Sequence, residues 1–230
     1  MGVNKRKVTS REAGAATVRR AKGEQTRLKI LQAVLDVIAR EGTRAVTHRA
    51  IAAEARVQLS LTTYYFKDIE AMIYEAFHYF SLRARPDVEQ FWEGIFAYLD
   101  HFSTVELRRV AIREAVCEEL AGRGADFLVE QITDKPVGLA VEQVLFTHTR
   151  LSPELRQLGE LHRRHLLEPL EALCSLFNRD DPQVDAELFF NTVTTLEYRA
   201  LAMPPDKVDR AHLNSLLRRH IGWILGLKRA

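Results

Sequence analysis

Cysteine is scarce in this sequence, which has only Cys117 and Cys174 among its 230 residues. Two thiols cannot form a disulfide framework, and since both lie among Val, Leu and Ala we expect them to be small buried groups. Long apolar runs are also missing, because no stretch reaches the roughly 18 residues that a membrane-spanning helix needs. The amino terminus is charged and has no apolar signal core. We therefore expect a cytoplasmic protein with no membrane segment.

The common motifs of enzymes are missing as well. The sequence has no Gly-rich phosphate loop, no Gly-x-Ser-x-Gly elbow and no Cys-x-x-Cys pair. His162 and His165 lie three residues apart on one expected helix, with His148 upstream, and such a group could hold a metal. The two arginines between the first pair favour a solvated helix face instead. We predict no catalytic residue, no metal site, no cofactor and no enzymatic activity.

Charge is divided unevenly along the chain, although the formal net charge is only +2. Residues 1–67 carry 14 Lys and Arg against 5 Asp and Glu, whereas residues 68–230 carry 19 against 26. A basic module joined to an acidic one is typical of a protein that meets a polyanion at one end. Within it, residues 1–23 are expected to form a basic flexible arm. Such an arm is either a solvated tail or a segment that follows the phosphate backbone or enters the minor groove.

Helical periodicity dominates the sequence, and we find no strand pair and no internal repeat, so the predicted fold class is all-α. The first helix, residues 24–41, has an apolar stripe that includes Leu31 and Ile38, and Gly42 ends it. Pro86 is expected to start a new helix, Gly122 and Gly124 to stop one, and Pro169 to kink or break one. The remaining predicted helices are 47–54, 59–66, 68–83, 87–102, 104–121, 125–133, 136–149, 152–178, 182–202 and 206–227.

Residues 47–67, THRAIAAEARVQLSLTTYYFK, have the spacing of a helix-turn-helix. Thr47 is a good N-cap for the first short helix, because its side-chain oxygen can accept from a free amide in the first turn. The second helix carries hydroxyl side chains that could reach base edges in a major groove. The residues that we predict to contact DNA are Thr47, Arg49, Gln58, Leu59, Ser60, Thr62, Thr63, Tyr64, Tyr65 and Lys67. Within that set, Gln58, Thr62, Tyr65 and Lys67 are expected to hold the DNA backbone.

The run from Glu24 to Phe80 resembles the amino-terminal DNA-binding domain of TetR-family transcriptional regulators. The resemblance is carried by GEQTRLKILQAVLDVIAREG, then Thr-x-Arg-x-Ile-Ala, then TTYYF, in that order. Arg56 stands where the family usually has a turn glycine, which implies a strained positive φ. Ile69 stands where a phosphate-contacting lysine is frequent, so Lys67 is expected to take over that contact. The resemblance implies that residues 24–67 bind DNA and that residues 68–230 bind a ligand and dimerise.

Two features of the second part are predicted to serve ligand binding and dimerisation. Apolar residues cover much of helices 182–202 and 206–227, and the family resemblance implies that these helices form a homodimer interface. Aromatic residues are frequent between residues 87 and 178, which is typical of a pocket for a small-molecule effector. The residues that we predict to line it are Phe91, Trp92, Phe96, Phe102, Cys117, Phe127, Phe146, His162, His165 and Phe177. Each of them could equally fill the core.

The sequence thus predicts a ligand-responsive repressor that binds a palindromic site on double-stranded DNA as a dimer. An alternative from another class is a helical partner-binding scaffold with a basic amino-terminal surface. A metal-dependent helical enzyme is a third alternative. The salt dependence of binding to random duplex DNA separates the first two, because contacts with several phosphates give a steep dependence.

Overall fold

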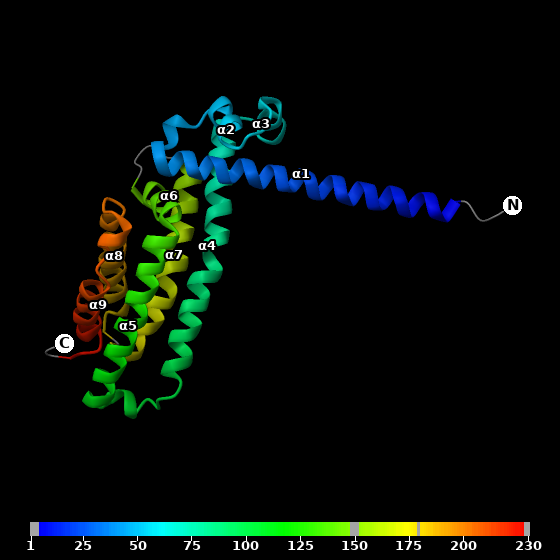
Figure 1. The fold of residues 1–230 in the computed structure, drawn as a ribbon. Helices are drawn as coiled ribbons and strands as arrows, with labels where there is room; N and C mark the ends of the chain where they lie inside the picture. The colour runs from blue at the N-terminus through cyan, green and yellow to red at the C-terminus, as the bar shows by residue number, and fades with distance from the viewer. Residues whose placement is uncertain (1–4, 148–151, 179, 228–230) are drawn as a thin grey trace. The chain divides into compact units, whose positions relative to one another are not determined.

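Helices make up every regular element in the part of the chain that the computed structural model describes, residues 5–147, 152–178 and 180–227, with side chains from residue 20 onward (Figure 1). Within these ranges there is no strand, as the sequence predicted. No described helix is both long enough and apolar enough to cross a membrane. The chain divides into two compact units, residues 1–79 and residues 80–230.

The first unit is a small helical domain with its own core. Its core includes Ile30, Val34, Ile38, Ile51 and Phe77, all of which are essentially inaccessible to solvent. Burying such side chains is the main favourable contribution to folding, at roughly 1.5–3 kcal/mol each. Its elements are α1 (Lys5–Glu41), a 3₁₀ turn (Thr43–Ala45), α2 (His48–Glu54), α3 (Leu59–Tyr65) and the first part of α4 (Ile69–Leu99).

Capping residues determine where these helices begin and end. The Oγ1 atom of Thr47 accepts a hydrogen bond from the Ala50 amide at 3.1 Å, and Oδ1 of Asp68 accepts one from the Ala71 amide at 2.8 Å. Gly42 follows α1 with a φ of 80°, a conformation that glycine adopts without strain. The predicted N-cap at Thr47 and the predicted glycine stop at Gly42 are confirmed, and Asp68 caps α4 in the same way.

Helix α1 begins at Lys5, whereas the sequence predicted a helix from residue 24 after a flexible arm. The segment from Arg11 to Lys22, REAGAATVRRAK, contains no proline and is rich in Ala, Arg, Lys and Glu. These residues have high intrinsic helix propensity. Once α1 is nucleated by the packing of its second half, the helix can continue backward through this segment residue by residue.

The second unit contains the rest of α4 and five further helices. Its core includes Val116, Leu120, Ala121, Leu128 and Leu217, which belong to one cluster of buried side chains. The final helix was predicted to begin at residue 206, but it begins after its N-cap Asp209, whose side chain accepts from the His212 amide at 3.0 Å. The helices are α5 (Val110–Asp134), α6 (Pro136–Thr147), α7 (Pro153–Phe177), α8 (Pro182–Ala200) and α9 (Arg210–Ile224).

Two prolines that were predicted to interrupt helices lie inside continuous ones. Helix α4 runs through Pro86 and α7 runs through Pro169, so the predicted start at residue 87 is wrong. Proline removes one hydrogen bond to the carbonyl four residues earlier, which for Pro86 is that of Leu82. Pro86 and Leu82 are both exposed, so water can satisfy the freed carbonyl of Leu82. The cost of the proline is therefore small enough for the surrounding packing to offset.

Gly122 and Gly124 lie within α5, and the predicted stop there is also wrong. A Cβ at position 124 would lie 3.1 Å from Cδ1 of Leu217 on α9, closer than ordinary packing allows. Gly124 thus lets α5 and α9 approach closely, which is a packing requirement rather than a helix-ending one. The predicted segments 104–121 and 125–133 are accordingly parts of one helix, apart from the residues before Val110.

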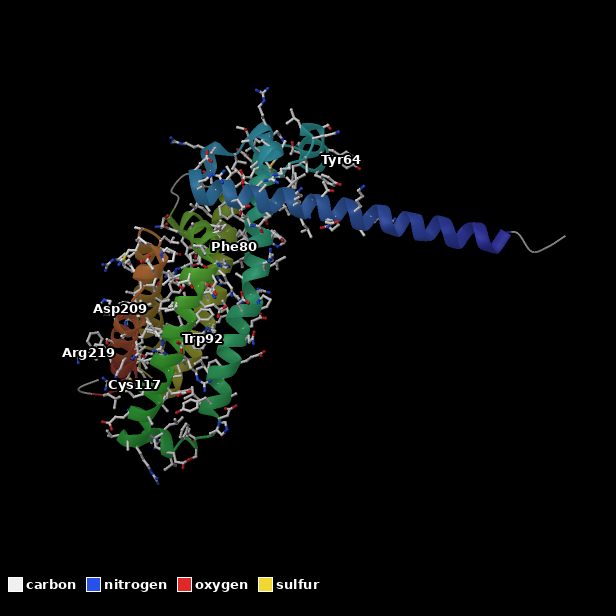
Figure 2. The ribbon with its side chains drawn as sticks, in the orientation of Figure 1. Tyr64, Phe80, Trp92, Cys117, Asp209 and Arg219 are labelled. Carbon is white, nitrogen blue, oxygen red and sulfur yellow. The ribbon has the colours of Figure 1, made fainter. Side chains whose placement is uncertain are left out.

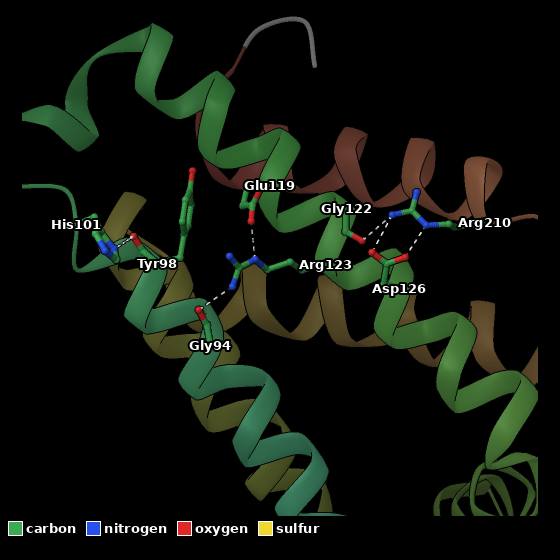
Figure 3. Close-up of polar contacts among 8 residues, drawn as sticks. All are labelled: Gly94, Tyr98, His101, Glu119, Gly122, Arg123, Asp126 and Arg210. Carbon is green, nitrogen blue, oxygen red and sulfur yellow. Dashed lines mark hydrogen bonds and ion pairs between the residues drawn. The ribbon is translucent and has the colours of Figure 1, made fainter.

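Polar contacts connect α5 with α4 and with α9 (Figure 3). Arg123 donates to Oε1 of Glu119 at 2.7 Å and to the backbone carbonyl of Gly94 on α4 at 3.0 Å. On the other side, Arg210 of α9 makes a two-point ion pair with Asp126, with nitrogen–oxygen distances of 2.5 and 2.9 Å. These partly exposed contacts link α5 to α4 and to α9.

Candidate functional site

A tight turn joins α2 to α3 and sets the angle between them. Arg56 in this turn has a φ of 51°, the left-handed conformation that the sequence predicted for it. The amide of Val57 donates to the Ala52 carbonyl at 3.0 Å, and the amide of Arg56 donates to that of Ala53 at 3.1 Å. These bonds close the end of α2 and direct the chain straight into α3.

The inner side of α3 is anchored by Thr62 and Phe66, whose exposed fractions are 0% and 1%. The Thr62 hydroxyl donates to the Leu59 carbonyl at 2.8 Å and lies 3.1 Å from Nδ1 of His48. Thr62 was predicted to hold the DNA backbone. That prediction is wrong, because a side chain that is fully buried within the domain cannot reach a phosphate.

The outer side of α3 presents the other predicted residues to solvent. Tyr64 projects from this helix with 78% of its surface exposed (Figure 2), and Leu59 is 47% exposed. Tyr65 is half-buried, since its ring meets Tyr64 edge-on at 5.0 Å and its hydroxyl lies close to Gly23 of α1. The remaining predicted residues are all exposed: Thr47, Arg49, Gln58, Ser60, Thr63 and Lys67.

Basic side chains in this unit separate into two groups. Arg27 is paired with Glu75, and Arg40 is paired with Glu54, so these two charges support the fold. Arg49 and Lys67, by contrast, make no ion pair with any described residue. Free cations beside an exposed helix suit phosphate oxygens, which position a protein on a nucleic acid.

A groove with a volume of about 630 Å³ lies between α4 and α7 in the second unit. It brings together three of the residues predicted to line a pocket: Trp92, Phe96 and His165. Sequence reasoning missed its acidic side chains, Glu89, Glu93, Asp100 and Glu168. The spacing of Glu89 and Glu93, four residues apart in the predicted helix 87–102, already places them on one helix face, but it does not show that Glu168 of α7 borders the same groove.

The other predicted lining residues do not border this groove. Cys117 is buried in the core, where burial raises the pKa of its thiol to about 11, and for the same reason the pKa of Cys174 is raised to about 12. Phe91 packs on Phe127 with ring centres 4.5 Å apart. Phe102, Phe146 and Phe177 pack against the main core cluster. These contacts favour the alternative that the sequence had left open, in which such side chains fill the core.

His162 takes part in a buried polar network that was not foreseen. Its Nδ1 lies 2.9 Å from the Ser81 hydroxyl, and its Nε2 lies 2.9 Å from Oε2 of Glu142. The Tyr198 hydroxyl donates to the other oxygen of Glu142 at 3.1 Å. Beside them Glu197 is buried, and burial together with the charge of Glu142 raises its pKa well above the ordinary value. Both ring nitrogens of His162 are thus engaged, and His148 lies outside the described residues.

Helices α8 and α9 leave large apolar side chains in solvent. Val184 and Leu188 on α8 and Trp223 on α9 are each more than half exposed. The two helices also contact each other, for example through Thr192 and His220, whose Oγ1 and Nδ1 atoms are 3.1 Å apart. Exposed apolar residues that gather on one helix pair are typical of an interface with another chain.

Comparisons with known proteins agree on one family. The family model described as "Tetracyclin repressor-like, C-terminal domain" matches residues 113–222. SCO7518 from Streptomyces coelicolor A3(2), a proposed transcriptional regulator, is similar to this chain in sequence and structure. It is 30% identical, with a TM-score of 0.53 over 85% of this chain and 98% of that chain. No curated protein matches the sequence.

More distant solved structures share the fold. A proposed TetR-family transcriptional regulator from Mesorhizobium loti MAFF303099 is 16% identical, with a TM-score of 0.60 over 90% of this chain and 98% of that one. The transcriptional regulator FadR from Bacillus subtilis, solved in complex with stearoyl-CoA, is 17% identical, with a TM-score of 0.53 over 87% and 98% of the two chains.

Proposed function

The chain belongs to the TetR family of transcriptional regulators, and we propose that it is a ligand-responsive repressor that binds a palindromic DNA site as a homodimer. The observation that carries this proposal is the division of α3 into two sides. Thr62 and Phe66 are buried, while Ser60, Thr63 and Tyr64 face solvent. A helix built in this way can enter a major groove and keep its own domain intact.

The proposed contacts with DNA follow from these exposures. Ser60, Thr63 and Tyr64 would meet base edges together with Arg49, since hydroxyls and guanidinium groups match the donor and acceptor pattern of the major groove. Lys67 would neutralise a phosphate. Gln58 at the start of α3 and the half-buried Tyr65 would fix the position of the helix on the backbone. The basic segment of α1, residues 5–23, would add phosphate contacts and so steepen the salt dependence of binding.

Dimerisation would use the exposed apolar side chains of α8 and α9. Burying Leu188 and Trp223 against the same residues of a second copy removes apolar surface from water. A two-fold axis through this interface repeats the reading helix and therefore requires a two-fold symmetric site. Ligand binding in the groove of the second unit would then favour either the DNA-bound or the free conformation of the dimer.

Selection of tight-binding duplexes from a random DNA library, at near-physiological salt, tests this function. We expect recovery of one two-fold symmetric sequence. Tyr64→Ala should weaken binding to that sequence by roughly ten-fold or more, the value of a good base contact, and should change binding to random DNA much less. Tyr74→Ala, which removes a less exposed tyrosine from α4, is the matched control and should leave both affinities unchanged.

Two outcomes would count against the proposal. Recovery of no symmetric sequence, with only salt-sensitive binding to any duplex, would favour the basic scaffold. An equal loss on specific and random DNA in the Tyr64 variant would show that this residue does not read bases.

A further inference from the structure

The groove between α4 and α7 has the size of a small-molecule site. Its volume of about 630 Å³ falls within the roughly 300–1,000 Å³ that ligand pockets usually have. One wall comes from residues 88–100 and the other from residues 165–169. Each wall is helical or directly follows a helix, so its side chains project from regular backbone.

The charge of this groove is unusually one-sided. Four of its lining residues are acidic, namely Glu89, Glu93, Asp100 and Glu168, and none is Lys or Arg. Glu93, Asp100 and Glu168 form no ion pair with any residue that the structure describes, and the nearest partner of Glu89 is His165 at 3.8 Å. Unpaired carboxylates around a hollow surface concentrate a negative potential within it.

The remaining lining residues supply an aromatic wall. Trp92 and Phe96 are one helical turn apart on α4 and half-buried, with ring centres 5.9 Å apart and ring planes inclined by 32°. Faces of aromatic rings attract cations, most strongly that of tryptophan. Aromatic faces beside carboxylates therefore favour a ligand that is both apolar and positively charged.

His165 adds a polar group that the fold leaves unsatisfied. Its Nε2 atom is buried and has no hydrogen-bond partner among the described residues, because Glu89 at 3.8 Å is too distant. Burial lowers the pKa of this imidazole, with a further contribution from the charge of Arg85. A neutral ring adds no positive charge to the groove and could exchange one hydrogen bond with a ligand.

We propose that this groove binds an organic cation with a bulky apolar or aromatic body, held between the Trp92 and Phe96 rings and the carboxylates of Glu89, Glu93 and Glu168. That this cation is the effector rests on the function proposed above. The binding of the cation to the groove does not rest on that function, and it can be tested without DNA.

Calorimetric titration of the full chain with tetraphenylphosphonium and with tetraphenylborate tests the charge requirement. The two ions have nearly the same shape and opposite charge. We expect the phosphonium ion to bind and the borate ion not to bind. The double variant E93Q/E168Q removes two groove carboxylates that support no ion pair, and it should weaken phosphonium binding by about ten-fold.

The matched control is E114Q/E160Q, which neutralises two exposed carboxylates outside the groove and changes the net charge equally. It should bind the phosphonium ion like the parent chain. No binding of the phosphonium ion, equal binding of both ions, or an equal loss in the two double variants would each overturn the inference. A failure to find a DNA site would overturn the proposed function and leave this result standing.

Discussion

The Nε2 atom of His162 lies 2.9 Å from Oε2 of Glu142, and both side chains are buried in the second unit. Neither residue can be removed alone without leaving a polar group unsatisfied, because Glu142 also accepts from the Tyr198 hydroxyl. Buried polar groups that lose their partner keep the full cost of their desolvation. The pair therefore constrains how α6, α7 and α8 pack, and it yields the first of four predictions.

Glu142→Leu should lower the free energy of unfolding by roughly 3 kcal/mol, because it leaves Nε2 of His162 and the hydroxyl of Tyr198 without their hydrogen-bond partner. Glu142→Gln retains the shape and one acceptor oxygen, and it should cost less than half as much. Urea denaturation followed by far-ultraviolet circular dichroism measures both values. A leucine variant as stable as the glutamine variant would mean that the network contributes nothing.

Glu197→Gln should stabilise the protein increasingly as pH rises. Burial and the nearby charge of Glu142 raise the pKa of Glu197 above its ordinary value of 4.5, so the folded state favours the protonated acid. Below that value folded and unfolded states both hold the proton, whereas above it the unfolded chain releases the proton and gains stability relative to the folded one. Glutamine has no proton to release. The gain in melting temperature over the parent should thus be small at pH 4.5 and larger at pH 8.

The exposed Glu160→Gln provides the comparison for that measurement, because its carboxylate is in water in both states. It should change the melting temperature by a similar small amount at both pH values. A Glu197→Gln effect that does not grow with pH would contradict the assigned direction of the shift.

Arg56→Gly should stabilise the first unit by about 0.5–1 kcal/mol. A residue with a Cβ pays roughly 1–2 kcal/mol in the left-handed conformation that Arg56 adopts, and glycine does not. The greater freedom of glycine in the unfolded chain offsets part of this gain. Arg56→Ala removes the same charge and keeps the Cβ, so it should show no gain. Equal stability of the two variants in chemical denaturation would exclude backbone strain as the cause.

Gly122→Ala should stabilise α5 by about 0.5–1 kcal/mol, since a Cβ there meets nothing within 4 Å and alanine is the better helix former. Gly124→Ala has the same helical benefit, but its Cβ would press on Leu217, which is 1% exposed and cannot easily move. Its gain should be smaller, or become a loss. Comparing the melting temperatures of the two variants isolates the effect of the contact with Leu217 on stability. A larger gain at position 124 than at position 122 would contradict the close approach of α5 and α9.

Local chemistry explains which features could be read from the sequence. The caps at Thr47 and Asp68 and the glycine after α1 depend on residues within a few positions of each other. So does the turn that forces Arg56 into a positive φ. These features therefore depend on short-range sequence, and the resemblance of residues 24–80 to TetR-family regulators, which implied the conformation of Arg56, rests on the same short-range pattern.

The features that the sequence did not predict depend on packing between segments that are distant in the sequence. Whether Pro86 interrupts a helix depends on the exposure of Leu82 to solvent, and the role of Gly124 depends on its contact with Leu217 of α9. Neither can be read from the neighbouring sequence. Thr62 has the composition of a DNA contact but faces inward, because His48 is placed opposite it. The groove and the network of His162 join side chains from separate helices. Their positions follow from close packing of whole helices, which short-range propensities do not contain.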